Sequence, residues 1–196
     1  MYVVYRVRDI IRIPPSLFTL PLEEAARRVL IDKYVGYVDP ELGVIVAVYN
    51  VKVNEYGRIL PGDGATYHES EFDVLAYKPV VKEVVEGTVV NVQEFGLFVS
   101  LGPIDGFIHR SQVSDEELRF DENRKAFIGV RTNRVVEKGD RVRARVIAVS
   151  MPTEPSQKPR IQLTMRQPLM GKIEWVREEV ERIEEAARRA AKATAR

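Results

Sequence analysis

The first 79 residues combine long stretches of alternating hydrophobic and polar positions with one helical pattern. Tyr2–Ile13 alternates Val, Ile and Tyr with charged residues, which predicts a strand with one solvated face. Between Thr19 and Gly36, apolar residues recur every three or four positions, with glutamates near the start, which predicts a helix. The β-branched run Gly43–Val53 and the extended pattern of Ala65–Tyr77 predict two more strands. Residues 1–79 are therefore expected to form an α+β unit.

The pattern changes after Pro79, where short hydrophobic runs alternate with glycine, proline and polar turns. Five such runs within residues 80–167 are typical of a small five-stranded β-barrel. The runs are Val84–Val92, Gly96–Leu101, Gly106–Ile108, Arg141–Val149 and Ile161–Met165. We therefore expect a second domain with a barrel fold.

Two segments interrupt the predicted barrel. The charged segment Ser114–Lys138 is longer than a typical connection, so we expect it to be partly helical or partly mobile. Within it, the acidic run from Asp115 to Glu117 is predicted to be the first turn of a short helix that Ser114 caps. Met151–Pro159 holds three prolines and is predicted to be a surface turn.

The last segment, residues 168–196, has the pattern of an amphipathic helix. Its apolar positions Ile173, Val176, Val180 and Ile183 step by three and four, and Glu–Arg pairs four residues apart support the helix. The sequence favours packing of this stripe on the protein's own barrel, with the Ala/Arg end fraying in solvent. The alternative is that the stripe meets a partner chain.

Composition narrows the functions that such a chain can have. With no cysteine and only two histidines, disulfide frameworks, thiolate zinc sites, iron–sulfur clusters and histidine-rich metal sites are excluded, and we expect no cofactor. No apolar run approaches the roughly 20 residues that span a bilayer, so we expect a soluble, cytoplasmic protein with no membrane contact. The net charge of +1 gives little overall attraction to phosphate, so any nucleic-acid binding must come from local chemistry.

Alternation after Phe95 makes a specific prediction about two aromatic side chains. If Leu97 and Val99 face the barrel interior, then Phe98 points outward and Phe95 lies at the strand entrance. An outward ring is costly in water unless something stacks on it, and nucleic-acid bases do so. The pattern therefore favours a surface on which bases stack.

Two neighbouring side chains would extend this surface. His109 and Arg110 would add a flat ring and a cation, and such groups stack bases and contact phosphates. The alternative is structural: Phe95 and Phe98 are core residues, and His109 caps a turn through Ser111. The residues alone leave both interpretations open.

The barrel region resembles the ribosomal-protein-S-one-type RNA-binding module, an OB barrel. The resemblance rests on Phe-Gly-x-Phe-Val, on Gly-Phe-Ile-His-x-Ser about ten residues later, and on the runs GDRVRARVIAV and RIQLT. It implies that the residues on the RNA face are Phe95, Phe98, His109 and Arg160. Two departures are Ser150, where the family usually has an acidic residue, and the length of the Ser114–Lys138 insert.

Arginines supply candidate phosphate contacts, which would make RNA affinity fall with salt. Three of them alternate with apolar residues along one predicted strand, so they point together and are expected on a neighbouring wall of the barrel. The candidates are Arg110, Arg141, Arg143, Arg145 and Arg160.

The N-terminal unit joined to such a barrel resembles the larger stalk subunits of archaeal RNA polymerase, a family that corresponds to the seventh subunit of eukaryotic RNA polymerase II. The resemblance rests on the opening MYVVYRVRDIIRIPPSLF, on the helix and on the segment from Tyr56 to Phe72. It implies a truncated RNP-like tip domain, residues 1–79, an OB-type barrel, residues 80–167, and a C-terminal helix, residues 168–196. The implied partners are the smaller of the two stalk subunits, the polymerase core near the clamp, and single-stranded RNA.

The resemblance also implies that a loop of the tip domain docks on the core. Physically the loop suits docking, because Ile59 and Leu60 offer an apolar plug and Pro61 limits the unbound ensemble. Its glycines permit backbone conformations that are closed to other residues. The predicted docking loop consists of Ile59, Leu60, Pro61, Gly62, Asp63 and Gly64. The alternative is an ordinary hairpin turn.

We therefore expect a non-catalytic subunit of an archaeal DNA-directed RNA polymerase that binds emerging RNA and supports initiation. The alternative is an RNA-binding subunit of another RNA machine, such as an exosome cap or a translation factor. A nuclease would need a catalytic cluster, and Glu69, Glu71 and Asp73 share one strand face as a two-metal site requires. A solvated or partner-facing acidic patch is the simpler explanation for these three residues. His68, which lies beside them in the sequence, is interpreted as a surface loop residue.

Overall fold

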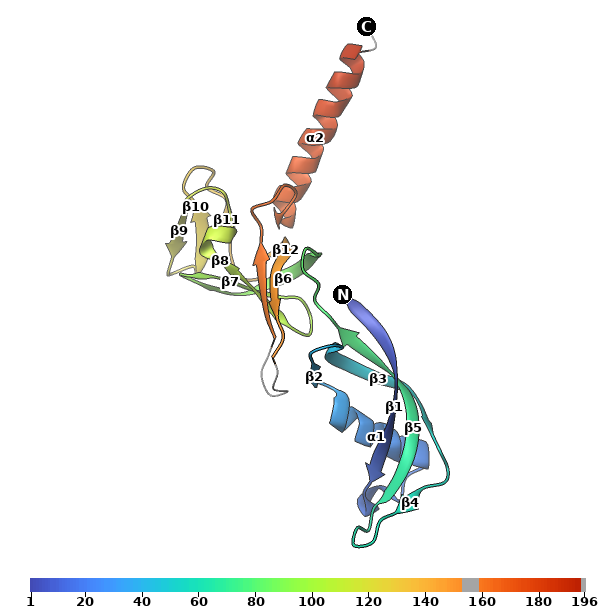
Figure 1. The fold of residues 1–196 in the computed structure, drawn as a ribbon. Helices are drawn as coiled ribbons and strands as arrows, with labels where there is room; N and C mark the ends of the chain where they lie inside the picture. The colour runs from blue at the N-terminus through green and yellow to red at the C-terminus, as the bar shows by residue number, and fades with distance from the viewer. Residues whose placement is uncertain (153–158, 195–196) are drawn as a thin grey trace. The chain divides into compact units, whose positions relative to one another are not determined.

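The computed structural model describes residues 1–152 and 159–194, which divide into two units (Figure 1). The main part of the first unit spans Met1–Lys78, and the second unit comprises Pro79–Ser150 and Pro159–Arg196. Most of the predicted surface turn, residues 153–158, lies outside the described residues. Among the residues that the structure describes, no helix is long and apolar enough to cross a membrane.

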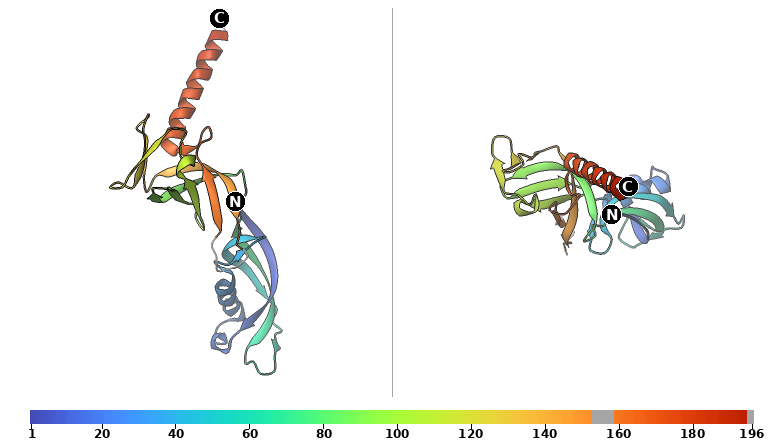
Figure 2. Two further views of the ribbon diagram at one scale, coloured as in Figure 1. Left: turned by 60° about the vertical axis from the view of Figure 1, so that its left-hand side comes forward. Right: turned by 90° about the horizontal axis from the view of Figure 1, so that it is seen from above.

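The first unit is an antiparallel sheet with one helix on it, as the α+β pattern predicted. The sheet has the strand order β1-β5-β3-β2, and a short strand β4 pairs with β5. Helix α1 (Leu22–Tyr34) lies along one face of the sheet, after a 3₁₀ turn η1 (Pro15–Leu17) (Figures 1 and 2). The strands are β1 (Tyr2–Ile13), β2 (Val38–Asp39), β3 (Gly43–Val53), β4 (Arg58–Ile59) and β5 (Thr66–Tyr77).

The core of this unit lies between α1 and the sheet. Because side chains alternate along a strand, Ile11 and Ile13 of β1 point toward the helix, and both are buried. They pack with Phe72 of β5 and Leu30 of α1. Charged residues of β1 and β5, such as Arg8 and Glu71, lie on the opposite face of the sheet.

The second unit contains the predicted five-stranded barrel. Its strands follow the order β13-β8-β7-β6-β12, and pairing of β12 with β13 closes the barrel. Leu97, Val99, Ile108 and Leu163 are among the side chains buried inside it. The strands are β6 (Val84–Gln93), β7 (Gly96–Ser100), β8 (Asp105–His109), β12 (Arg141–Ser150) and β13 (Arg160–Thr164), and a 3₁₀ turn η2 (Arg110–Gln112) follows β8.

The segment Ser114–Lys138 is a small sheet, which the sequence did not predict. It contains β9 (Leu118–Asp121), β10 (Ala126–Gly129) and β11 (Val135–Val136), in the order β11-β10-β9. The predicted helix at Asp115–Glu117 is wrong. The carboxylate of Glu116 instead accepts hydrogen bonds from the backbone amides of Arg131, at 2.9 Å, and Thr132, at 3.0 Å, so it stabilises the turn that follows β10.

Helix α2 (Ile173–Thr194) follows the short strand β14 (Gly171–Lys172). Val176 is buried, whereas Val180 is 36% exposed and Ile183 is 53% exposed. The expectation that the whole stripe packs on the barrel is therefore wrong beyond the first turns. The anchored end is held by stacking of the Arg134 guanidinium on Trp175, with 5.2 Å between the guanidinium carbon and the ring centroid.

Candidate nucleic-acid interface

Side chains of β7 alternate between the interior and the outer wall of the barrel. Leu97 and Val99 are both 0% exposed, whereas Phe98 is only partly buried and faces outward, as the alternation predicted. Phe95 precedes the strand and is 53% exposed. The interpretation of Phe95 and Phe98 as core residues is therefore wrong.

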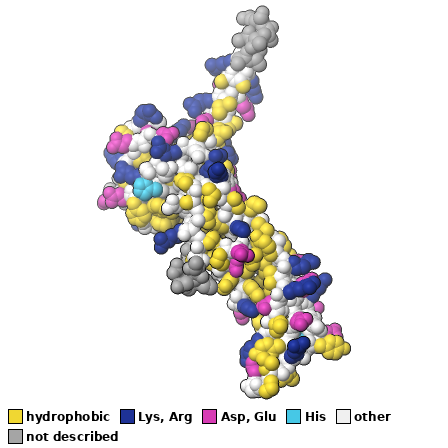
Figure 3. All heavy atoms as spheres, viewed as in Figure 1, with side chains coloured by type: hydrophobic (Ala, Val, Ile, Leu, Met, Phe, Trp, Pro, Cys, Tyr) yellow, Lys and Arg dark blue, Asp and Glu magenta, His cyan; other side chains and the backbone are white. Residues whose placement is uncertain are grey.

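Four rings gather on this outer wall, and we call them the ring cluster: Phe95, Phe98, Phe107 and His109. Phe98 and Phe107 are cross-strand neighbours of β7 and β8, with ring centroids 5.2 Å apart. Phe107 also contacts Phe95, at 5.9 Å between centroids, and His109, at 6.5 Å. Figure 3 shows a histidine beside a hydrophobic area on the barrel unit. The cluster is thus a partly exposed aromatic surface with Phe107 at its centre.

Phe107 was missing from the predicted site. It lies between Gly106 and Ile108, which are both buried, so the alternation that placed Phe98 outward also applied to β8. The signal was present in the sequence. That signal is weak, because the run Gly106–Ile108 has only three residues.

Gly96 is what allows the rings to lie so close to the sheet. A Cβ atom at this position would come within 2.3 Å of the Ile108 carbonyl oxygen and 2.7 Å of Cε2 of Phe107. The Phe107 ring therefore covers the space that any other residue's side chain would fill.

His109 is exposed and is also anchored to the turn that follows it. Its Nδ1 accepts a hydrogen bond from the Ser111 backbone amide at 3.2 Å, and the Ser111 hydroxyl lies 2.8 Å from the same nitrogen. The predicted cap through Ser111 is therefore present, but it does not remove the ring from the surface. The two interpretations of His109 are compatible.

Arg160 and Arg110, two predicted cations of the RNA site, have different surroundings. Arg160 is exposed at the start of β13, two residues before Gln162, which is the register partner of Phe107. The guanidinium of Arg110 instead donates to the Leu118 carbonyl oxygen of β9. Arg110 is therefore held against the insert and is not a free cation of the ring cluster.

Arg143 lies on another wall of the barrel. It belongs to β12, and β6 separates this strand from the ring-bearing β7. Its guanidinium pairs with the Glu86 carboxylate of β6 at 2.8 Å. The structure therefore does not bring Arg143 together with Phe98.

The predicted docking loop begins at Ile59, the last residue of β4, and exposes its apolar residues. Ile59 is 73% exposed, Leu60 is 48% exposed, and the nearby Tyr56 is 88% exposed. Gly62 has a φ of 87°, in the left-handed region that glycine tolerates best. The loop thus holds apolar side chains in solvent on a tight turn.

One carboxylate ties this turn to the sheet. Asp63 accepts two hydrogen bonds from the Arg12 guanidinium of β1, both at 2.8 Å, one from the Tyr67 hydroxyl at 2.7 Å and one from the Ala65 amide at 3.1 Å. The bonds from Arg12, followed by those from Tyr67 and Ala65, hold the pKa of Asp63 well below its ordinary value. Leu60 accepts from the Asp63 amide at 3.1 Å, which closes the turn.

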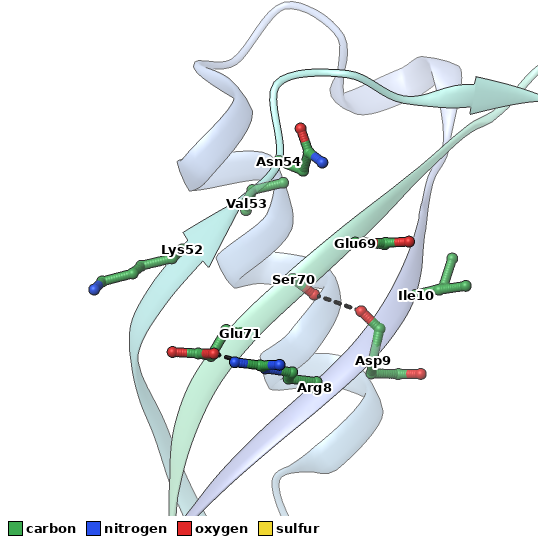
Figure 4. A pocket seen from close by; sticks show the side chains of 9 residues that line it. All are labelled: Arg8, Asp9, Ile10, Lys52, Val53, Asn54, Glu69, Ser70 and Glu71. Carbon is green, nitrogen blue, oxygen red and sulfur yellow. Dashed lines mark hydrogen bonds and ion pairs between the residues drawn. The ribbon is translucent and has the colours of Figure 1, made fainter.

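Glu69 and Glu71, two of the three acidic side chains considered for a nuclease, line a groove of about 600 Å³ on the open side of the first sheet (Figure 4). Arg8 donates to Glu71 at 2.7 Å, and Arg6 donates to Asp73 at 2.9 Å. The pKa of Glu71 is lowered by Arg8, and that of Asp73 by Arg6. In the described ranges, no three histidine or acidic side chains are grouped to hold a metal ion.

The prediction that His68 is a surface loop residue is wrong. It lies within β5 and is only 5% exposed. Its Nδ1 is 2.8 Å from the Asn54 carbonyl oxygen, and its ring lies so close to Gly57 that a Cβ there would be 2.5 Å away. His68 therefore supports the segment that leads into the docking loop.

Comparison with known proteins agrees with this division into two units. Residues 8–64 match the SHS2 domain found in the N terminus of Rpb7p/Rpc25p/MJ0397, and residues 78–166 match the S1 RNA binding domain. The DNA-directed RNA polymerase III subunit RPC8 of Saccharomyces cerevisiae is 30% identical over 101 residues, which are 52% of this chain and 48% of the relative.

Archaeal relatives match over nearly their whole length. The DNA-directed RNA polymerase subunit Rpo7 of Saccharolobus shibatae is 49% identical over 176 residues, which are 90% of this chain and 97% of the relative. The chain belongs to the Rpo7 family of archaeal RNA polymerase subunits. Rpo7 of Sulfolobus acidocaldarius is 44% identical over 180 residues, 92% of this chain and 97% of the relative.

Membership in the Rpo7 family confirms the predicted fold class and makes the chain a stalk subunit of RNA polymerase with an S1 RNA-binding domain. The ring cluster lies within the S1 match, and the docking loop lies within the SHS2 match. The roles of the individual residues remain predictions.

Proposed function

We propose that this chain is a non-catalytic stalk subunit that docks on the polymerase core near the clamp and binds the emerging transcript as single-stranded RNA. We further propose that it pairs with the smaller of the two stalk subunits. The observation that carries the RNA-binding part is the ring cluster, because three phenylalanine rings and a histidine face outward from the wall of an S1 barrel.

Base stacking is the interaction by which the ring cluster would bind single-stranded RNA. The face of every base is a flat π surface, and stacking on an aromatic side chain is worth roughly 1 to 3 kcal/mol per base. Phe98 and Phe107 together would hold one or two bases with little sequence preference. Arg160, exposed on the neighbouring strand, would meet the phosphate backbone.

The docking loop supports the assembly part of the proposal. Exposed apolar residues on a tight turn can enter a pocket of a partner at little entropic cost, because the turn is already ordered. Ile59 and Leu60 would make this contact, and Pro61, Gly62, Asp63 and Gly64 would present them. Docking near the clamp would favour the clamp state that binds the stalk better, and so support initiation.

A non-catalytic role is supported by how the acidic side chains are used. Glu71 and Asp73 are each engaged by an arginine of β1, and these ion pairs would compete with a metal ion for the carboxylates. These two ion pairs join β1 to β5 across the open face of the sheet, which is consistent with a structural role.

Measurement of RNA affinity tests the proposal. Phe98→Ala with Phe107→Ala, in the full chain, should weaken binding of a single-stranded RNA of about ten nucleotides by at least about tenfold, since each stacked base contributes roughly 1 to 3 kcal/mol. Phe18→Ala removes another exposed ring, 51% exposed, from the first unit and should leave affinity unchanged. Circular dichroism checks the fold. A folded double variant with unaltered affinity would remove the ring cluster from the RNA site.

A further inference from the structure

The two ring nitrogens of His109 have different surroundings. Nδ1 is occupied by Ser111, whose backbone amide donates to it at 3.2 Å and whose hydroxyl lies 2.8 Å away. Within the part of the chain that the structure describes, Nε2 has no hydrogen-bond partner, and the ring is exposed. One nitrogen is therefore anchored and the other is open to a ligand.

The anchor decides which nitrogen carries the proton. A backbone N–H can only donate, so Nδ1 must be the acceptor in this contact. A neutral imidazole that accepts at Nδ1 carries its hydrogen on Nε2. The Ser111 hydroxyl can donate to the same Nδ1 and so reinforces this tautomer. The outer edge of the ring is then an N–H donor.

The turn that holds the ring is itself fixed to the barrel. The Met165 amide donates to the Gln112 carbonyl oxygen at 2.8 Å, and the Thr164 hydroxyl donates to the Gln112 side-chain oxygen at 2.8 Å. On the other side, the Arg110 amide donates to the Phe95 carbonyl oxygen at 2.9 Å. Turn η2 is thus connected to β13 and to the entrance of β7, so His109 keeps a constant direction relative to the ring cluster.

We propose that His109 recognises RNA as a hydrogen-bond donor through Nε2–H, toward an oxygen of the sugar–phosphate backbone, and that Ser111 is the residue that positions it. This rests on the proposed RNA-binding function and assigns His109 a task different from stacking. Its place at the edge of the ring cluster suits it, since its ring is tilted by 69° from that of Phe107. A base lying on Phe107 would have its own sugar and phosphate beside the cluster, within reach of this donor.

Two substitutions distinguish a donor from a structural cap. His109→Asn keeps an oxygen that can cap the Ser111 amide, but it has no donor at the distal position. His109→Gln gives up the cap, but its longer side chain carries an NH₂ group to about the place of Nε2. The proposal and a purely structural role therefore predict opposite results.

RNA affinity of the full chain gives the first readout. We expect His109→Ala and His109→Asn to weaken binding about 5- to 10-fold, the effect of losing one hydrogen bond to a backbone oxygen. His109→Gln should stay within about twofold to threefold of the unchanged protein, since its NH₂ group replaces the donor. If His109→Asn binds as well as the unchanged protein and His109→Gln does not, His109 acts only as a cap and the proposal is wrong.

The affinities of the same variants for a 2′-deoxy oligonucleotide of the same sequence identify the acceptor oxygen. A loss on His109→Ala that occurs with RNA alone identifies the 2′-hydroxyl oxygen, and an equal loss with both identifies a phosphate oxygen. Either result supports the proposal. Equal affinity of all three His109 variants and the unchanged protein for both strands overturns it. In that case, a loss of RNA affinity in the variant that combines Phe98→Ala and Phe107→Ala would show that the ring cluster still binds RNA. Only the role of His109 would then be rejected.

The tautomer has a spectroscopic signature that does not depend on RNA. The chain has only two histidines, so long-range ¹H–¹⁵N spectra of the full protein with and without His109→Gln assign the His109 ring. We expect the neutral ring to carry its hydrogen on Nε2 and none on Nδ1. A ring protonated at Nδ1 alone would contradict the assignment of the donor.

Discussion

At the scale of single residues, two-residue periodicity placed the most informative side chains. Leu97 lies inside the barrel and Phe98 outside, because the side-chain period of a strand leaves no other arrangement once one face is buried. Phe107 obeys the same rule. Positions that depend on how a neighbouring segment folds back were not predictable: Arg110 turns to the Leu118 carbonyl oxygen, and His68 is covered by the segment at Gly57.

Gly96→Ala tests how closely the rings lie on the sheet. The added methyl group would meet the Ile108 carbonyl oxygen at 2.3 Å, a backbone atom that cannot move aside freely. We expect a loss of about 1 to 3 kcal/mol in the free energy of unfolding, the usual cost of overpacking. Gly64→Ala is a matched control, since its nearest contact would be an ordinary 3.5 Å from Pro15. Urea unfolding of both variants measures the difference, and equal stability would contradict the geometry.

At the scale of elements, long patterns were predictable and short ones were not. The helix between Thr19 and Gly36 and the long strands of the first unit were found because many positions repeat the same period. The sheet within Ser114–Lys138 was missed because β9 and β10 have only four residues each and charged residues surround them. There the acidic side chain of Glu116 stabilises a distant turn, although its place in the sequence is typical of a helix start.

The link between Asp63 and Arg12 predicts how the first unit responds to acid. The pKa of Asp63 is lowered in the folded protein, chiefly by Arg12, so its contribution to stability is complete above the ordinary carboxyl pKa of about 3.9 and is lost as pH falls below it. Asp63→Asn should therefore lower the melting temperature at pH 6, and the difference from the unchanged protein should shrink toward pH 2.

Melting curves measured by circular dichroism between these pH values test this expectation. Asp32→Asn is the control, since this exposed carboxylate of α1 has no ion pair among the described residues. A melting difference for Asp63→Asn that stays constant as the pH falls would show that the carboxylate does not act through its charge.

At the scale of the whole molecule, the proposed docking loop and the proposed RNA surface lie on different units. The loop belongs to the unit matched by the SHS2 domain, and the ring cluster belongs to the unit matched by the S1 domain. The two activities should therefore be separable by substitution.

Changing Ile59 and Leu60 to Asp tests the separation. Charges in place of the apolar plug should weaken capture by core polymerase at least about tenfold, since losing a buried hot spot commonly costs about 2 kcal/mol or more. Pairing with the smaller stalk subunit and affinity for RNA should be unchanged. Tyr56→Ala removes the neighbouring exposed ring and is the control for a general effect of changing this surface. Reconstitution with normal yield would remove these residues from the docking surface.

The most direct test of the account follows the transcript itself. Polymerase assembled with this chain would transcribe an RNA that carries a photoreactive uridine at increasing distances behind the growing end, and crosslinked peptides would be identified by mass spectrometry. The account predicts crosslinks in the stretch from Phe95 to His109, and their loss when Phe98 and Phe107 are changed to Ala. Crosslinks elsewhere on the chain, with none in this stretch while the stalk remains bound, would contradict it.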